Sequence, residues 1–333
     1  MPRNAPRILV TRQLALDPRE VLEPLLGPEG EAFLLDAWAR ESPMPREELL
    51  ARVAKAEALV CSPADPIDAE LLAHAPSLRV VANHAVGLDN LNLAVLEARG
   101  IPATHTPGVL TDATADLALA LLLSLARRLP EGERMIHEGR FHGWSPRMLL
   151  GLELRGACLG IFGFGRIGQA VAARASAFGM GIYYCARRDG PSEVVMPIGA
   201  RRVPFDELLE KSDVISLHCP LTEETRHAIN AATIAQMRRG ALLINTARGP
   251  VLDEEAAADA LESGHLGGIA LDVHEHEPQI NARLLAHPRA LLLPHLGSAT
   301  ISTREAMARL ALTDAARVLL GKKPLHPAPR YSK

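Results

Sequence analysis

Short apolar runs recur along the chain, and neighbouring runs are separated by segments long enough to form helices. Runs without polar positions are typical of strands that are buried on both faces of a sheet. Such strands in alternation with helices indicate parallel α/β sheets, because each parallel crossover needs a long connection. The strand-like runs lie at residues 8–10, 58–61, 78–82, 159–162, 181–184, 214–217, 241–244, 268–271 and 291–293.

The spacing of these runs predicts two domains. The chain has 333 residues, more than one hydrophobic core usually holds. An apolar helix at 117–126 separates the first three runs from the rest. We therefore predict two doubly wound parallel-sheet domains, a Rossmann-type dinucleotide domain at 104–295 and a smaller flavodoxin-like substrate domain at 1–103 and 296–333.

The end of the chain carries a helical pattern at 302–320 and no further strand. We expect this helix to pack on the first domain, and 324–329 to form a frayed tail. The longest apolar run, 117–126, is about half the length of a membrane span. No apolar segment after the charged residues 1–7 is long enough for a signal peptide.

A glycine turn links the run at 159–162 to a helical pattern at 167–177. It reads Gly163-Phe164-Gly165-Arg166-Ile167-Gly168. In such a turn the first glycine makes the bend, the second lets the backbone approach a pyrophosphate, and the third lets helix and strand pack closely. Methyltransferases and flavoproteins use similar turns, so the motif alone does not identify a nicotinamide site.

The end of the next strand bears on the choice of coenzyme. NAD enzymes place an acidic residue there, about 20 residues after the glycines, to bind the ribose 2′-hydroxyl. Here Cys185 takes that place, and no acidic residue follows before Asp189. Arg187 and Arg188 could instead bind a 2′-phosphate. This predicts that NADPH is preferred over NADH; the alternative is that both arginines are merely solvated loop residues.

Polar side chains collect just after three later runs. Arg248 follows 241–244, Glu277 follows 268–271, and His295 follows 291–293. In open parallel sheets ligands bind beyond the carboxyl ends of the strands. The three residues supply a cationic fork for an anionic substrate, a proton donor, and a carboxylate that favours the imidazolium form of that donor. Singly, Arg248 or His295 is more often structural; together they predict reduction of a 2-keto acid.

Composition excludes some classes of partner. The formal net charge is −3, and no long run of one sign favours nucleic acid or a membrane surface. The four cysteines have no CxxC spacing and lie in or beside apolar runs, which is typical of reduced thiols and predicts a cytoplasmic location. The run His274-Glu275-His276-Glu277 carries common metal ligands, but it lacks a third clustered ligand, so we predict no metal.

The chain resembles the D-isomer-specific 2-hydroxyacid dehydrogenases in the motifs at 159–168, 244–249, 271–278 and 294–300. The resemblance implies that Arg248 binds the substrate, His295 is the acid/base, and Glu277 is its partner. The coenzyme site that we then expect comprises Thr114, Gly163, Gly165, Arg166, Ile167, Gly168, Arg187, Arg188, Pro220, Thr246, Asp272 and Gly297, with Asp272 holding the nicotinamide carboxamide.

Further motifs are similar to the glyoxylate/hydroxypyruvate reductases of this family. Residues 80–90 match the substrate loop, which implies that the Val86 and Gly87 amides bind the substrate carboxylate. The segments 106–116 and 143–146 match this subgroup. In the subgroup, the tryptophan reaches the active site of the partner subunit, which implies the same role for Trp144 here. The alternative is that Trp144 lies in the core. The subgroup often has an arginine where this chain has Ala186, which weakens the NADPH prediction.

The predicted reaction is NAD(P)H-dependent reduction of glyoxylate or hydroxypyruvate to the D-2-hydroxy acid. Alternatives are a reductase for 2-ketogluconate or phosphohydroxypyruvate, and a non-catalytic, NAD(H)-sensing protein of the corepressor type. A phosphorylated substrate would call for further cations near the substrate loop, where His84 is the only candidate. The apolar segments 117–128 and 135–144 predict a homodimer.

Overall fold

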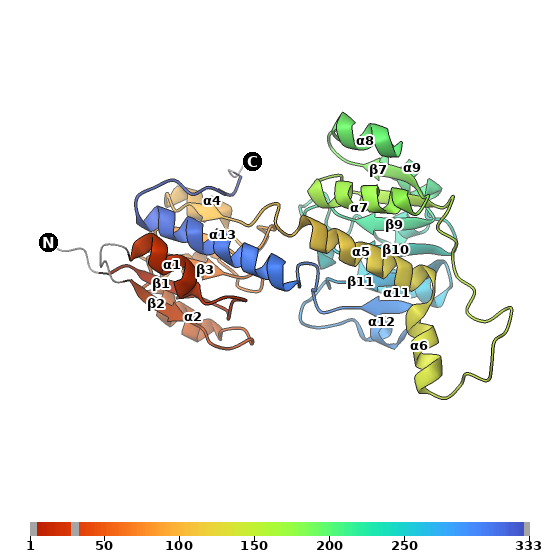
Figure 1. The fold of residues 1–333 in the computed structure, drawn as a ribbon, viewed down its shortest axis with the longest axis horizontal. Helices are drawn as coiled ribbons and strands as arrows, with labels where there is room; N and C mark the ends of the chain where they lie inside the picture. The colour runs from red at the N-terminus through yellow and green to blue at the C-terminus, as the bar shows by residue number, and fades with distance from the viewer. Residues whose placement is uncertain (1–4, 28–32, 330–333) are drawn as a thin grey trace. The chain divides into compact units, whose positions relative to one another are not determined.

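The computed structural model describes residues 5–27 and 33–329, which belong to two compact units (Figure 1). Unit 1 consists of the chain up to Leu110 together with the chain from Ala299 onward. Unit 2 is Thr111–Ser298. Each unit has a parallel sheet with helices on both faces, as the alternation of strand-like and helical segments predicted.

The sheet of unit 1 has the flavodoxin-like strand order β2-β1-β3-β4-β5 within the described residues. All of its pairings are parallel. Its strands are β1 (Arg7–Val10), β2 (Leu34–Ala37), β3 (Ala58–Cys61), β4 (Val80–Asn83) and β5 (Ala103–Thr104). Its helices are α1 (Pro18–Leu26), α2 (Arg46–Val53), α3 (Ala69–Ala73), α4 (Leu93–Ala98) and α13 (Ile301–Leu319).

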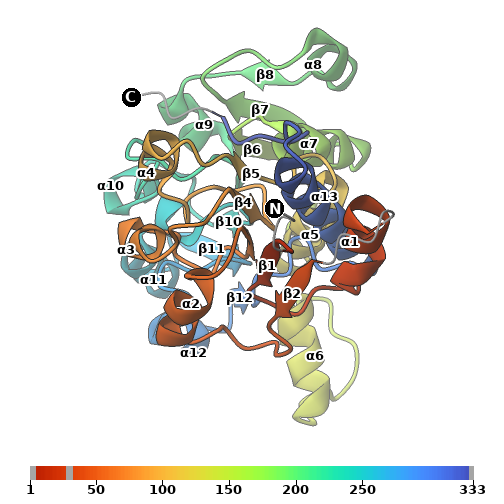
Figure 2. The ribbon, with the colours of Figure 1, turned by 90° about the vertical axis from the view of Figure 1, so that its left-hand side faces the viewer.

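Alternating side chains of each strand enter two separate cores in unit 1. Helices α1 and α13 cover one face of the sheet, and α2, α3 and α4 cover the other (Figure 2). In β1, Ile8 and Val10 belong to the core with α1 and α13, whereas Leu9 belongs to the core with α2, α3 and α4. Each fully buried aliphatic side chain contributes about 1.5–3 kcal/mol to folding. The sheet is therefore held from both faces, which keeps the loops at its carboxyl edge in place.

The C-terminal segment belongs to unit 1. Helix α13 packs on α1, β3 and β4, so the expectation that it returns to the first domain is confirmed. The expectation of a frayed tail at 324–329 is wrong, because the buried Asp314 carboxylate accepts hydrogen bonds from the amides of Leu325 and His326, at 2.6 and 3.0 Å. The Ala328 amide also donates to the Ala103 carbonyl.

Unit 2 has the strand order β12-β11-β10-β9-β6-β7-β8 within the described residues. The chain reverses direction across the sheet between β6 and β9, which is the Rossmann arrangement. The strands are β6 (Cys158–Phe162), β7 (Gly181–Cys185), β8 (Arg201–Arg202), β9 (Val214–Leu217), β10 (Ala241–Asn245), β11 (Leu266–Leu271) and β12 (Ala290–Leu292). The helices are α5 (Thr111–Ala126), α6 (Leu129–His137), α7 (Arg166–Ala177), α8 (Ser192–Ile198), α9 (Phe205–Lys211), α10 (Ala231–Ile234), α11 (Glu254–Glu262) and α12 (Ala282–Ala286), with a 3-10 turn at Gly249–Val251.

The two units meet in sequence a few residues later than the predicted boundaries of 103/104 and 295/296. After β5, the amides of His105 and Thr106 still donate to carbonyls of unit 1. After β12, the amides of Leu296 and Gly297 are bonded to Asp272 of unit 2. The hydrogen bonds thus assign the segment after β5 to unit 1 and the segment after β12 to unit 2. The pattern of apolar residues cannot show this, because it does not report hydrogen bonds.

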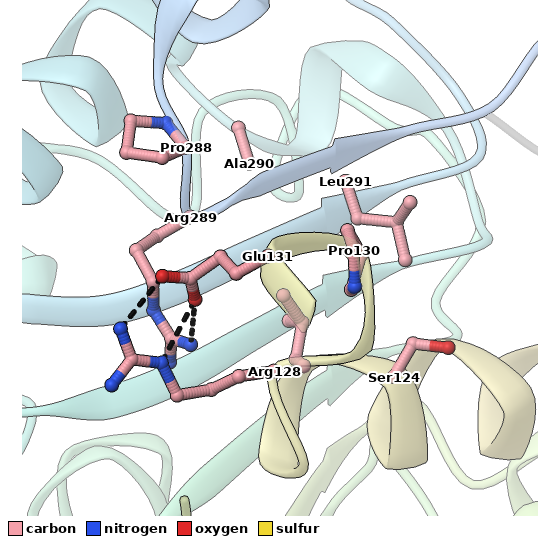
Figure 3. Close-up of a pocket in the computed structure, with 9 residues that line it drawn as sticks. Ser124, Arg128, Pro130, Glu131, Pro288, Arg289, Ala290 and Leu291 are labelled. Carbon is pink, nitrogen blue, oxygen red and sulfur yellow. Dashed lines mark hydrogen bonds and ion pairs between the residues drawn. The ribbon is translucent and has the colours of Figure 1, made fainter. Parts of the chain in front are cut away.

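Helix α6 extends away from the rest of unit 2 and is attached to it by an ionic cluster (Figures 1 and 3). The Glu131 carboxylate accepts two hydrogen bonds from Arg128, at 2.9 and 2.6 Å, and one from Arg289, at 2.8 Å. Hydrogen bonding to Arg128 and then to Arg289 outweighs burial and lowers the pKa of Glu131 to about 2. Arg289 adjoins β12, so the cluster fixes the start of α6 to the sheet.

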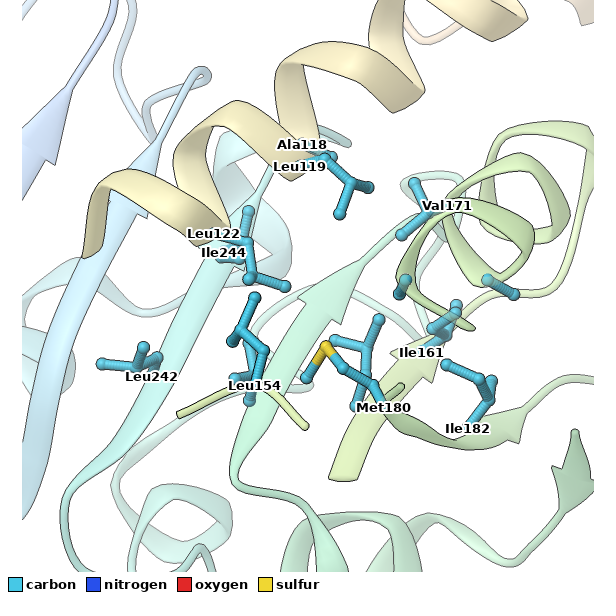
Figure 4. Close-up of a cluster of buried hydrophobic side chains, with 14 of the residues drawn as sticks. Ala118, Leu119, Leu122, Leu154, Ile161, Val171, Met180, Ile182, Leu242 and Ile244 are labelled. Atoms are coloured by element: carbon cyan, nitrogen blue, oxygen red, sulfur yellow. The ribbon is translucent and has the colours of Figure 1, made fainter. Parts of the chain in front are cut away.

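Helix α5 is buried against the sheet of unit 2 (Figure 4). Its side chains Leu119 and Leu122 pack in one cluster with Val171 of α7 and with Ile161 and Ile244 of the strands. The apolar character of 117–126 is therefore explained by a core, and this helix gives less support to a dimer than the sequence suggested. Within the described ranges, no helix is both long and apolar enough to cross a membrane.

Candidate active site

His295 and Glu277 form a hydrogen-bonded pair in the loops that follow β12 and β11. His295 Nδ1 lies 3.2 Å from Glu277 Oε2, and the two side chains are 37% and 41% exposed. The sequence places these residues in separate loops, and the parallel pairing of β11 with β12 brings the loops together. With Nδ1 bonded to a carboxylate, Nε2 is the nitrogen that can face a reacting group.

Asp272 builds the turn that carries His295. Its carbonyl accepts the His295 amide at 2.8 Å, and its carboxylate accepts the amides of Leu296 and Gly297 at 2.6 and 2.8 Å. His295 has a φ of 59°, a left-handed conformation that side chains rarely adopt and that the surrounding hydrogen bonds must hold. Burial of Asp272 raises its pKa, although the two amides and the charge of His295 act in the opposite direction.

The environment of Glu277 favours its ionised form. Burial alone would raise the pKa of this carboxyl, but the hydrogen bond and charge of His295 outweigh burial and hold the pKa below its usual value. A second donor, the backbone amide of His274, lies 3.1 Å from Glu277 Oε1. The carboxylate is thus an anionic hydrogen-bond partner for the His295 ring.

Arg248 follows β10 and emerges at the same edge of the sheet, since β10 and β11 are neighbours. The buried Asn245 shapes its turn by accepting the Ala247 amide at 2.9 Å and donating to the Arg248 carbonyl at 2.9 Å. The next residue, Gly249, packs so closely that a Cβ there would lie 1.9 Å from the His274 carbonyl oxygen. The turn that carries Arg248 is therefore in direct contact with the loop that leads to Glu277.

The three glycines of the turn after β6 have two different physical roles. A Cβ on Gly163 would lie 2.4 Å from the Cys219 amide nitrogen, and one on Gly168 would lie 2.3 Å from the Gly163 carbonyl oxygen. These two positions need glycine for packing. A Cβ on Gly165 would meet no described atom within 4 Å, and no side chain caps the helix that begins at Arg166. Space and free amides at a helix N-terminus fit the pyrophosphate of a dinucleotide.

Two further residues that the sequence assigned to the coenzyme lie beyond strand ends of unit 2, and a third, Thr114, lies in the first turn of α5. Pro220 follows β9, Thr246 follows β10, and the Thr114 hydroxyl donates to the Gly297 carbonyl at 3.0 Å. The Thr246 hydroxyl is buried, and the described residues offer it no hydrogen-bond partner. A buried polar atom without a partner is costly, so Thr246 also fits a site that a ligand completes.

The loop after β7 is held by a residue that the sequence analysis did not find. Arg202 of β8 donates to the Ala186 carbonyl at 2.8 and 3.1 Å and to the Arg187 carbonyl at 3.2 Å, and it pairs with Asp189 at 3.0 Å. The charge of Asp189 is thereby neutralised locally. Arg187 and Arg188 are exposed on this loop.

The predicted substrate loop of unit 1 is shaped by two asparagine side chains. Asn83 donates to the Gly87 carbonyl at 2.8 Å and to Asn90 at 3.1 Å, and Asn90 donates to the Ser62 carbonyl at 3.0 Å. The His105 ring also contacts the Val86 carbonyl at 3.2 Å. These bonds fix the backbone at Val86 and Gly87. The sequence pattern gives no sign of these roles of Asn83, Asn90 and His105.

His84 and Trp144 resolve two alternatives that the sequence left open. His84 is buried, and burial lowers its pKa to about 4 despite a contact with the Arg304 carbonyl. It is therefore neutral at physiological pH and gives no cation for a phosphorylated substrate.

Trp144 is 81% exposed, so its interpretation as a core residue is wrong for the single chain. Among the described residues, no three His, Cys, Asp or Glu side chains gather as a metal site requires.

Comparison with known proteins agrees with this geometry. The model of the D-isomer specific 2-hydroxyacid dehydrogenase NAD binding domain matches residues 119–297. The glyoxylate reductase of Thermococcus litoralis is 44% identical over 323 residues, which cover 96% of this chain and 95% of that protein. The chain belongs to the D-isomer specific 2-hydroxyacid dehydrogenase family.

Solved structures of this family are similar along the whole chain. A glyoxylate reductase from Paecilomyes thermophila has a TM-score of 0.86 and 35% identity, with 99% of each chain covered. An NADPH-dependent glyoxylate/hydroxypyruvate reductase from Sinorhizobium meliloti, solved with NADP and malonate, has a TM-score of 0.82 and 33% identity, with 98% of this chain and 99% of that chain covered. The protein is thus a dehydrogenase of this family, and unit 2 is its nicotinamide dinucleotide domain.

The space in front of Gly165 generates a test of coenzyme binding. Gly165→Ala should leave the free energy of unfolding within about 0.5 kcal/mol, because the new methyl group meets no protein atom, yet weaken NADH and NADPH binding about tenfold or more. Calorimetric titration measures the binding and urea unfolding the stability. Gly168→Ala is the control and should lower stability, since its Cβ would strike backbone; unchanged coenzyme affinity in Gly165→Ala would contradict the assignment.

Proposed function

We propose that this dehydrogenase reduces a small 2-keto acid, glyoxylate or hydroxypyruvate, to the D-2-hydroxy acid with NAD(P)H. The observation that carries the proposal is the His295–Glu277 pair at the sheet edge from which Arg248 emerges. An imidazole bonded to a carboxylate is a proton donor suited to neutral pH, and a nearby guanidinium suits a carboxylate substrate. Relatives named glyoxylate reductase and glyoxylate/hydroxypyruvate reductase support this substrate class.

The side chains would divide the reaction as follows. The Arg248 guanidinium, together with the amides of Val86 and Gly87, binds the carboxylate of the keto acid and fixes one face of its carbonyl group. The nicotinamide ring, when bound, supplies the hydride to the carbonyl carbon. His295 Nε2 gives its proton to the carbonyl oxygen, and Glu277 stabilises the imidazolium until that transfer. Unit 1 is then the substrate domain and unit 2 the coenzyme domain.

NADPH is the proposed coenzyme, with NADH as the alternative. Cys185 stands where NAD enzymes carry an acidic residue, and Asp189 is paired with Arg202. The exposed Arg187 and Arg188 are therefore the charged groups of this loop that remain for a 2′-phosphate. The coenzyme contacts that we propose are those of Thr114, Gly163, Gly165, Arg166, Ile167, Gly168, Arg187, Arg188, Pro220, Thr246, Asp272 and Gly297.

A small, unphosphorylated keto acid is favoured over phosphohydroxypyruvate. The one basic residue of the substrate loop, His84, is buried and neutral at physiological pH. A phosphate would need charged donors there. 2-Ketogluconate stays an alternative substrate, since it carries no phosphate.

We further propose a homodimer in which Trp144 reaches the active site of the partner. Helix α6 and the segment after it expose large apolar side chains, whereas the described residues of α6 include no buried side chain. The exposed side chains are Leu129, Ile136, Phe141, Trp144 and Leu150. Monomers rarely expose so much apolar surface in one region.

The four cysteines are free thiols, which supports a reducing compartment such as the cytoplasm.

Steady-state kinetics test the reaction and the coenzyme together. NADPH and NADH oxidation are measured with glyoxylate, hydroxypyruvate, pyruvate and 2-ketogluconate. We expect the highest kcat/KM with glyoxylate or hydroxypyruvate, and a higher kcat/KM with NADPH than with NADH. A preference for NADH removes the 2′-phosphate assignment, and coenzyme binding without any turnover indicates a binding-only protein of the corepressor type.

Two substitutions separate the roles in the proton-donating pair. His295→Ala should lower kcat by roughly 10²- to 10⁴-fold, the usual worth of a positioned acid, with coenzyme affinity nearly unchanged. Glu277→Gln removes the carboxylate that pairs with His295 Nδ1, so kcat should fall, and the acid limb that reports protonation of Glu277 should disappear from the pH–rate profile. Full pH–rate profiles of both variants provide the measurement; near-normal turnover in His295→Ala excludes His295 from the reaction.

Light scattering tests the dimer. Ile136→Glu places a charge among the exposed apolar side chains of α6 and should yield monomers at micromolar concentration. Leu285→Glu is the matched control, since Leu285 is 69% exposed on α12, and it should leave the dimer intact. A wild-type monomer would contradict both the dimer and the role of Trp144 in the partner's site.

A further inference from the structure

His274 joins the two loops that carry the proton-donating pair. Its imidazole is almost fully buried, with 3% of the side chain exposed. Ring atom Nε2 lies 2.9 Å from the Leu293 carbonyl oxygen, and Leu293 precedes His295 by two residues. Its backbone amide donates to Glu277 Oε1 at 3.1 Å. One residue therefore contacts both the segment that leads into His295 and the carboxylate of Glu277.

The groups around the His274 ring favour its charged form. Nε2 faces a carbonyl, and Nδ1 lies 3.7 Å from Oε1 of the buried Glu254. The 3.7 Å contact is an ion-pair distance, and within the described residues the buried Nδ1 has no hydrogen bond. With Nε2 donating to the carbonyl, a proton on Nδ1 is what Glu254 attracts. Burial opposes the charge, but the carboxylate of Glu254 and the Leu293 carbonyl outweigh burial and raise the pKa of His274. The charged groups that face the ring are Glu254 of α11 and Glu277 of its own loop.

Glu254 is itself held in place. Its Oε1 accepts the Glu275 amide at 2.9 Å, and its own amide donates to Glu275 Oε2 at 3.3 Å. The other oxygen of Glu275 contacts His227 Nε2 at 2.6 Å. The His274 ring thus has a fixed anion on one side and the Leu293 carbonyl on the other. The Leu293 amide is bonded to the Leu271 carbonyl, so hydrogen bonds hold the peptide groups on both sides of the Leu293 Cα.

We propose that His274 is a positioning residue for the catalytic pair, whose ring, held between Glu254 and Leu293, sets the distance between Glu277 and His295. The inference rests on the proposed reaction. His295 has a left-handed backbone, and its position depends on the hydrogen bonds of the preceding residues. A shift of about 1 Å at a reacting group can lower a rate about 100-fold, so a bond at Leu293 can affect the chemistry without contacting the substrate.

His274→Gln tests the proposal, with His276→Gln as the matched control. Residue 276 lies in the same loop but is exposed. In His274→Gln we expect kcat to fall about 10- to 100-fold, with KM for NADPH and coenzyme affinity within twofold. The acid limb of the kcat/KM profile should move to higher pH, because the cation that helps to lower the pKa of Glu277 is gone. His276→Gln should change none of these quantities.

The charge of His274 also predicts how stability depends on pH. A histidine with a raised pKa in the folded state contributes stability that is complete below about pH 6.5 and is lost as pH rises through its folded-state pKa. The difference in the free energy of unfolding between wild type and His274→Gln should therefore shrink as pH rises. Urea unfolding of the full chain at several pH values measures it; a constant difference contradicts a charged ring.

Nitrogen-15 spectra of histidine-labelled protein keep the inference separate from the proposed reaction. In the wild type, His274 should stay protonated to a higher pH than a free histidine, and the signals of His295 should shift in His274→Gln but not in His276→Gln. A His274 ring that loses its proton at or below the pH at which a free histidine does, or unchanged His295 signals together with unchanged kcat, overturns the inference. If wild-type protein shows these spectra yet reduces no keto acid, the proposed reaction fails and the link between His274 and His295 stands.

Discussion

The parallel pairing of β10, β11 and β12 is the constraint on which the site depends. Parallel neighbours place their carboxyl ends at one edge of a sheet, so loops that are far apart in sequence arise side by side. Arg248, Glu277 and His295 each come from one of these three loops. The hydrogen bond between His295 and Glu277 follows from that register, and Asp272 then fixes the turn through its backbone and its carboxylate.

Each of the buried carboxylates near this edge of the sheet accepts hydrogen bonds from nearby donors. Burial acts against the charged forms of Asp272 and Glu277, and nearby donors counter it in part at Asp272 and outweigh it at Glu277. Asp272 receives two amides, Glu277 receives an amide and an imidazole, and Glu254 receives an amide and faces His274. The glycines complete the arrangement by permitting close backbone contacts, most clearly at Gly249, where a side chain would overlap the His274 carbonyl.

Apolar pattern and motif spacing predicted the two sheets, their parallel class and the strand ends that carry the polar residues. Weak or local elements escaped prediction for physical reasons. Strand β8 consists of two arginines and β5 of two residues, so neither produces an apolar run. Strand β2, at the sheet margin, has exposed residues at both ends and half-buried residues between them, and it lacks the continuous apolar signal of a central strand.

The supporting side chains of the site were harder to predict than the site itself. Three of these side chains bond to backbone carbonyls: Arg202, Asn83 and His274. Every residue has a carbonyl, so the sequence does not indicate which one will be the partner. His274 was considered only as a metal ligand, because its neighbours in sequence suggested one. Its actual neighbours, Glu254 and Leu293, become apparent only once the chain is folded.

The central claim is that a guanidinium and a carboxylate-bound imidazole surround one reacting carbonyl. A crystal structure with the coenzyme and a non-reactive 2-keto acid analogue tests it most directly. The account predicts that Arg248 binds the carboxylate of the analogue, that His295 Nε2 lies within hydrogen-bonding distance of its keto oxygen, and that the nicotinamide C4 is about 3.5 Å from its carbonyl carbon. An analogue bound away from His295, or with its keto oxygen facing the opposite side, would contradict the account.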